Sequence, residues 1–178
     1  MRAFRSATVG AALLCALSGA PALSAGLPAR TLADTDVSVP DDLPPGALLI
    51  VGFSRGSNGQ TEPWRKRVDA DAELAPLAYS VLVLEGAPRW VRGLIVRGVR
   101  RAVPEEQHDS VLVVTRGGDV WRAWVGFEAA SQDAAYILRV DGLGGTCFHH
   151  VGAVSEDVLL ASRDAECASG DAESAEGA

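Results

Sequence analysis

The chain has 178 residues, with 23 acidic and 16 basic side chains and a formal net charge of −7 at pH 7. This length suits one compact domain, and the acidic balance argues against a nucleic-acid partner. The apolar run near the N-terminus is too short to span a bilayer, so we expect no stable membrane anchor.

The N-terminus has the pattern of a secretory signal peptide. Arg2 and Arg5 precede an apolar run over residues 7–17, and small residues follow it. A basic start, a short apolar core and a small-x-small exit are typical of a segment removed on export. We therefore expect residues 1–24 to be a signal peptide and the mature protein to be periplasmic or secreted. The alternative is an uncleaved N-terminal anchor.

A buried strand and a helix are predicted after the signal peptide. Residues 25–40 are expected to form an extended lead-in. Residues 47–53 are continuously apolar between a Pro-Pro-Gly turn and a glycine-rich loop, which is typical of a strand buried on both faces. The loop over residues 54–60 follows. A helix is expected over residues 61–74, with Thr61 as its N-cap.

The rest of the chain continues the alternation of strands and helices. A second strand is predicted over residues 77–84 and a third over residues 109–115. Between them, residues 89–103 form the clearest predicted helix, with arginines over much of the surface opposite its apolar face. Residues 119–127 fit either a short helix or a hairpin arm. Two more strands, over residues 134–140 and 146–151, precede a short helix from about Ser155. The predicted apolar face of the helix over residues 89–103 consists of Val91, Leu94, Ile95, Gly98, Val99 and Ala102.

This order predicts an α/β fold with a central mixed sheet flanked by helices. Strand–helix alternation gives the parallel part of the sheet, and the C-terminal hairpin gives an antiparallel edge. We expect the domain to occupy residues 41–163. Residues 164–178 are rich in small and acidic residues and are predicted to be an acidic disordered tail.

The C-terminal segments resemble those of thioredoxin-like proteins. The strand from Tyr136 to an Asp-x-Gly turn, the next strand, the turn at Gly152 and the helix from Ser155 follow the same order as in that superfamily. More narrowly, the junction from Phe53 to Trp64 resembles the family that includes the mitochondrial assembly chaperone of the ATP synthase Fo sector. The resemblance covers about residues 35–162. It implies a thioredoxin-like fold and a role in binding or assembly without redox chemistry.

This chain has no cysteines at the position where thioredoxin-like enzymes carry out their thiol chemistry. The junction that carries Cys-x-x-Cys in redox-active thioredoxins has no cysteine here, and Gln132 and Asp133 stand where a cis-proline is usual. We therefore interpret residues 54–60 as a recognition loop or a connector and predict no catalytic residue, no metal site and no cofactor. The expected function is binding or assembly of a protein partner, for example a subunit of a membrane complex. Candidate binding residues are Ser54, Arg55, Ser57, Asn58, Gln60 and Trp64 at the junction, and Arg97, Arg100 and Arg101 on the arginine-rich helix.

The two cysteines of the mature chain leave other functions open. In an oxidising compartment Cys147 and Cys167 are candidates for a disulfide, or Cys147 is buried and Cys167 is free in the tail. The main alternative function is a thiol–disulfide or peroxiredoxin-like enzyme that uses Cys147. Cys147 and His149 share a strand face, but two ligands do not make a metal site.

A serine hydrolase is the lesser alternative. Residues 52–56 match the nucleophile-elbow pattern G-x-S-x-G with Ser54 at its centre, and the pattern lies between a strand and a helix. Asp141 and then His149 or His150 follow in the hydrolase order. However, too few residues precede this strand for the several strands that an α/β-hydrolase needs before its elbow.

Overall fold

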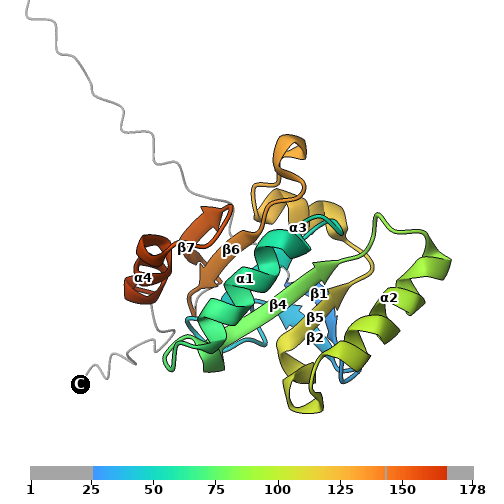
Figure 1. Ribbon diagram of the computed structural model, residues 1–178, viewed down its shortest axis with the longest axis horizontal. Coiled ribbons are helices and arrows are strands. Elements are labelled where there is room, and N and C mark those ends of the chain that lie inside the picture. The colour runs from blue at the N-terminus through green and yellow to red at the C-terminus, as the bar shows by residue number, and fades with distance from the viewer. Residues whose placement is uncertain (1–25, 143, 168–178) are drawn as a thin grey trace, which may run out of the picture.

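The structure, a computed structural model, describes residues 26–142 and 144–167 (Figure 1). The predicted signal peptide and positions 168–178 of the predicted tail lie outside the described residues. The described strands are β1 (Leu27–Thr31), β2 (Asp36–Val39), β3 (Leu48–Gly52), β4 (Ala78–Val83), β5 (Val111–Val114), β6 (Tyr136–Val140) and β7 (Thr146–Val151). The described helices are α1 (Asn58–Asp69), α2 (Arg89–Ala102), α3 (Gly118–Trp124) and α4 (Glu156–Asp164), with shorter 3-10 turns at Ala75–Leu77, Glu105–Ser110 and Ala129–Ser131.

The strands form one mixed sheet in the order β2-β1-β5-β4-β3-β6-β7, which confirms the predicted α/β class. β3 lies in parallel beside β4 and antiparallel beside β6, so both of its edges are hydrogen-bonded. Leu48, Leu49, Ile50 and Val51 are each at most 1% exposed. The continuous apolar run therefore forms the doubly buried strand that its composition predicts.

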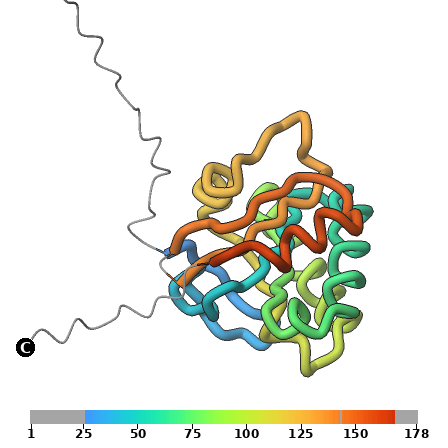
Figure 2. The backbone as a smooth tube through the Cα atoms, turned by 90° about the vertical axis from the view of Figure 1, so that its left-hand side faces the viewer, coloured from blue at the N-terminus to red at the C-terminus, as the bar shows by residue number. Residues whose placement is uncertain are grey.

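The helices divide between the two faces of the sheet. Trp64 of α1 and Leu159 of α4 pack over Ile50, and α2 packs farther along the same face through Val99. Trp121 of α3 packs over the opposite face, in the cluster that contains Val51. Figure 1 shows α1, α4 and α2 on the near side of the sheet, and Figure 2 looks onto the edge that β7 and α4 form. The two crossovers β3-α1-β4 and β4-α2-β5 thus lie on one face, as parallel steps in one direction require.

The N-terminal segment belongs to the sheet. An extended lead-in is expected over residues 25–40; the described part, residues 26–40, contains the antiparallel hairpin of β1 and β2, and β1 also pairs with β5. Leu27, Ala29 and Thr31 are buried while the residues between them are exposed. The hairpin therefore covers the edge of β5, which would otherwise carry unpaired backbone groups.

Two details of the helices differ from the prediction, and a third decides between predicted alternatives. α1 begins at Asn58, because the loop before it is closed by serine side chains and the helix starts earlier than Thr61. Residues 118–124 form a helix, which decides between the two predicted alternatives for that segment. α2 packs through Val96, Val99 and Val103 and leaves Leu94 58% exposed, so its packed face is rotated from the predicted one.

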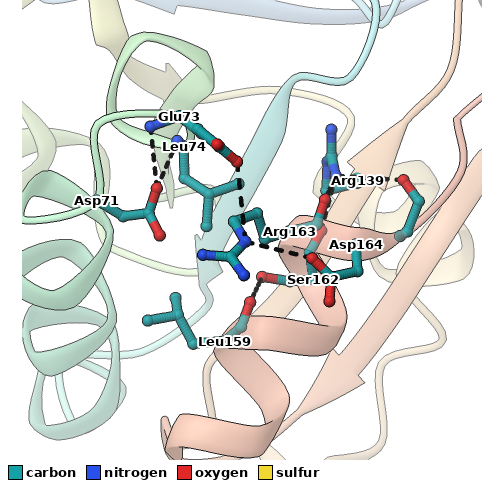
Figure 3. Close-up of polar contacts among 9 residues, drawn as sticks. Asp71, Glu73, Leu74, Arg139, Leu159, Ser162, Arg163 and Asp164 are labelled. Carbon is teal, nitrogen blue, oxygen red and sulfur yellow. Dashed lines mark hydrogen bonds and ion pairs between the residues drawn. The ribbon is translucent and has the colours of Figure 1, made fainter.

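Arg139 of β6 fastens α4 to the sheet (Figure 3). This side chain is 9% exposed. Its guanidinium donates to the carbonyl oxygens of Ser162 at 2.7 Å, Arg163 at 2.9 Å, Ala165 at 3.3 Å and Gly46 at 3.2 Å. Burial lowers the pKa of Arg139 from its ordinary value, but an arginine keeps its proton in proteins. The carbonyls at the C-terminal end of α4 carry the negative end of the helix dipole and compensate the charge.

We expect Arg139→Met to lower the free energy of unfolding by about 2–4 kcal/mol, because the buried carbonyls that it serves would lose a charged donor. Urea unfolding followed by circular dichroism measures this loss. Arg30→Met is the control, since Arg30 forms an exposed ion pair with Asp36 and such pairs contribute little to stability. Equal losses in the two variants would contradict the role of Arg139.

Candidate functional site

Two serines close the loop between β3 and α1. The backbone N–H of Ser57 donates to Ser54 Oγ at 3.1 Å, and the Ser57 hydroxyl donates to the carbonyl of Ser54 at 2.7 Å. Ser57 is 2% exposed, whereas Ser54 is half-buried. Short polar side chains that bond to nearby backbone in this way favour turns and helix starts. Ser57 therefore shapes the loop, and Ser54 remains accessible at its surface.

Asp133 joins this loop to the start of β6. The Ser54 hydroxyl donates to Asp133 Oδ1 across 79 positions of sequence. A Cβ atom added to Gly56 would lie 2.5 Å from the Asp133 carboxyl group, so only glycine allows this approach. Gln60 Oε1 accepts a hydrogen bond of 3.1 Å from the N–H of Ala135 in the same segment. The segment that enters β6 is thus held against the first turn of α1.

The spacing of the two serines is that of the missing redox pair. Ser54, Arg55, Gly56 and Ser57 follow the buried strand and open the helix, and the serines are three positions apart, as the cysteines of Cys-x-x-Cys are. Asp133 takes the place of the usual cis-proline segment. Since a hydroxyl does not exchange disulfides, the junction as built has no thiol chemistry. The sequence signal for this arrangement is the Ser-x-x-Ser spacing. Both serines are among the predicted binding residues, but the prediction did not take their spacing into account.

Aromatic side chains form one wall beside Ser54. The centroid of the Phe53 ring lies 4.8 Å from the centroid of the Phe127 ring and 5.4 Å from that of the Tyr136 ring. The Arg122 guanidinium lies 5.6 Å from the centre of the Phe127 ring, within the range of a cation–π interaction. Phe53 and Phe127 stay half-buried. Sequence reasoning missed this wall, because its members come from three separate segments.

The other predicted binding residues have different surroundings. Arg55 and Asn58 are exposed at the junction. Trp64 is fully buried, and its indole N–H donates to the carbonyl of Gly152 at 2.9 Å, so this side chain belongs to the core and cannot contact a partner directly. The predicted arginines lie on α2, which packs over a different part of the sheet. Arg97 and Arg101 are exposed there, and Arg100 forms an ion pair of 2.9 Å with Asp34.

The hydrolase triad is not assembled. The hydroxyl of Ser54 is bonded to Asp133 and to no histidine. His149 Nε2 lies 3.0 Å from the carbonyl oxygen of Val125, and His150 Nε2 bonds the carbonyl of Ala153. A general base must lie within hydrogen-bond reach of its nucleophile, so the elbow pattern at Ser54 has no catalytic partner in this geometry.

Cys147 and Cys167 form a disulfide with a Cα–Cα distance of 5.2 Å. It ties β7 to the segment after α4, near the carbonyls that Arg139 serves. Within residues 26–142 and 144–167, no cluster of three or more His, Cys, Asp or Glu side chains is arranged to hold a metal ion. Of the helices in those same ranges, none has the length and apolar character needed to cross a membrane.

No protein-family model matches this chain, and no curated protein matches it in sequence. Solved structures do match its fold. The exposed lipoprotein thioredoxin Etrx1 of Streptococcus pneumoniae superposes with a TM-score of 0.52 and 11% identity, over 78% of this chain and 97% of that one. StoA of Bacillus subtilis gives a TM-score of 0.49 and 12% identity, over 80% and 98%. A secreted Mycobacterium tuberculosis disulfide oxidoreductase homologous to Escherichia coli DsbE gives 0.49 and 14%, over 79% and 96%.

The likeness to Etrx1 establishes the fold and no more, because the identity is only 11%. The protein has a thioredoxin-like fold, as its sheet order and the Etrx1 match show. None of the three matches described gives support to the narrower resemblance to the ATP synthase assembly chaperone.

We expect the double variant Ser54→Cys/Ser57→Cys to form a second disulfide, because the loop already brings these two positions into contact. Alkylation followed by intact-mass measurement counts the free thiols of the protein produced without residues 1–24, and the expected number is zero. The matched control is Ser54→Cys/Asn58→Cys, in which the second thiol is one position farther along the helix and stays free. Free thiols in both variants would contradict the proposed equivalence to the redox position.

Proposed function

We propose that this protein is an exported binding or assembly factor that engages a protein partner at the β3–α1 junction without thiol–disulfide exchange. The observation that carries the proposal is the hydroxyl pair at the redox position. Ser54 and Ser57 stand there in place of a thiol pair. The hydroxyl of Ser54, which is the accessible one, already donates its hydrogen bond to Asp133. The site therefore presents fixed polar groups rather than a nucleophile.

The surface around the junction has the composition of a protein-binding site. Arg55 offers guanidinium donors and Asp133 offers carboxylate acceptors, and both are exposed. Phe53, directly before Ser54 in the chain, packs against Phe127, and both rings are half-buried. Aromatic residues and arginine are enriched where protein interfaces gain most of their affinity. This combination suits a polypeptide partner better than a small metabolite, for which an enclosed apolar pocket is usual.

Export rests on the predicted signal peptide and on the chemistry of the cysteines. Disulfides persist in the oxidising compartments outside the cytoplasm, and the Cys147–Cys167 bond suits such a location. A subunit of a membrane complex is one partner that an exported assembly factor would meet. The resemblance of the junction to the assembly-chaperone family is the basis for naming that class.

The second candidate is a redox enzyme that uses the Cys147–Cys167 disulfide. Both cysteines are partly exposed, so a thiol reagent could reach the bond. However, Cys147 lies within a strand, whereas activated thiols are found at helix N-termini or beside a cationic group. No positively charged side chain is bonded to either sulfur among the described contacts. The hydroxyl pair at the junction makes the binding function our preferred proposal.

Site-specific crosslinking in the exported protein tests the binding surface. We expect the photo-crosslinking residue benzoylphenylalanine in place of Arg55 to give a discrete protein adduct, because Arg55 is the exposed centre of the junction. The matched control carries the same residue in place of Lys66, which is exposed near the other end of α1.

Two outcomes decide this test. Asp133→Arg, added to the variant crosslinked at position 55, should remove the adduct by reversing the charge beside Ser54, and a reducing agent should leave the adduct intact. Equal adducts from positions 55 and 66, or none from position 55, would contradict binding at the junction.

A further inference from the structure

The inner side of α2 is fully engaged with the rest of the fold. Val96 and Val99 pack against the cluster that contains Val113. Arg92 donates to the carbonyls of Ala87 at 2.8 Å and Thr115 at 2.9 Å, and Arg100 pairs with Asp34. These contacts fix the rotation of the helix about its own axis. Its opposite side must therefore point away from the sheet.

That outward side carries both apolar and basic residues. Trp90 is 77% exposed and Leu94 is 58% exposed, four positions apart on the helix. Arg97 and Arg101 continue the same line at intervals of three and four residues and are exposed, so the four side chains share one face. No residue of α2 is buried, although large apolar side chains of a monomer usually are. We call Trp90, Leu94, Arg97 and Arg101 the outer face of α2.

The arginines of this face have no internal partner. Within the described residues, no hydrogen bond or ion pair involves the side chain of Arg97 or Arg101. Glu105 and Glu106 follow the helix closely in sequence, yet neither pairs with them. The chain as a whole is acidic, with a net charge of −7. The outer face is thus a cationic strip on an acidic protein, and its charge is complementary to an anionic surface.

We propose that the outer face of α2 docks reversibly on an anionic lipid bilayer. Tryptophan is enriched at the level of lipid headgroups, and arginines on a helix lying in the interface attract anionic lipids. α2 lies at the side of the molecule away from α4 (Figure 1). Its outer face combines exposed apolar side chains with unpaired arginines, which suits the interface of an anionic bilayer. This docking is independent of the junction at Ser54.

Vesicle cosedimentation of the exported protein tests this docking. We expect binding to vesicles of phosphatidylglycerol and phosphatidylcholine and no binding to vesicles of phosphatidylcholine alone. Salt at 0.5 M should release the protein, because it shortens the Debye length to about 4 Å and screens the attraction between the arginines and the lipid. The Trp90 emission should shift to the blue on binding and be quenched by brominated lipid. Trp64 and Trp121 are fully buried and Trp124 is half-buried on α3, so their emission should not shift on binding.

Charge reversal separates this face from the net charge of the protein. Arg97→Glu/Arg101→Glu should weaken vesicle binding by about 30-fold or more. Lys66→Glu/Arg116→Glu changes the net charge equally at exposed positions elsewhere and should leave most of the binding. Leu94→Ala should weaken binding without changing the charge. Failure to bind anionic vesicles, or equal losses in the two charge-reversal variants, would overturn the proposal, as would capture of a protein partner by this face without lipid binding.

Discussion

The burial of β3 between two hydrogen-bonded neighbours determines the position of the site. Its parallel partner β4 and its antiparallel partner β6 satisfy both edges, and its side chains are covered on both faces. The antiparallel register opposes Val51 to Tyr136. Three residues beyond Val51 is Ser54, and three residues before Tyr136 is Asp133. The hydrogen bond between Ser54 and Asp133 therefore continues the register of the sheet beyond its last pair.

This geometry explains why the junction can keep the shape that it has in redox-active thioredoxins while its chemistry differs from theirs. A loop that closes at positions three apart, at the start of a helix, suits a thiol pair and a hydroxyl pair equally well in shape. Only the thiols can exchange disulfides. Replacing them leaves an accessible, preorganised surface whose donors and acceptors are already oriented. Such a surface binds at a lower entropic cost than a mobile loop.

Much of the fold follows from local sequence pattern, and the rest depends on distant contacts. The apolar run of β3 and the helical periodicity of α2 are local, so both were predictable. The β1–β2 hairpin was not, because its short strands become regular only by pairing with β5. The rotation of α2 depends on Arg92 and Arg100 finding partners outside the helix. Because these contacts cannot be read from the helical periodicity, the periodicity alone predicts that Leu94 faces the sheet, whereas its side chain is exposed.

The candidate site shows the same division. Ser54 and Ser57 were predicted as binding residues from their place between a strand and a helix. Asp133 was missed as their partner, because the contact requires the register of β3 and β6. Trp64 is one of the predicted binding residues of the junction, whereas its ring is fully buried and its indole N–H donates to the carbonyl of Gly152. The pairing of Cys147 with Cys167 stayed open until the path of α4 back along β7 was known.

Reduction of insulin disulfides by dithiothreitol in the presence of the protein produced without residues 1–24 is the most direct measurement of thiol–disulfide exchange. If the hydroxyl pair defines the junction, the wild-type protein leaves the rate equal to that of dithiothreitol alone. The Cys147→Ser/Cys167→Ser variant then behaves in the same way. A faster rate with the wild-type protein that disappears in this variant would contradict a non-redox function and assign catalysis to the Cys147–Cys167 disulfide.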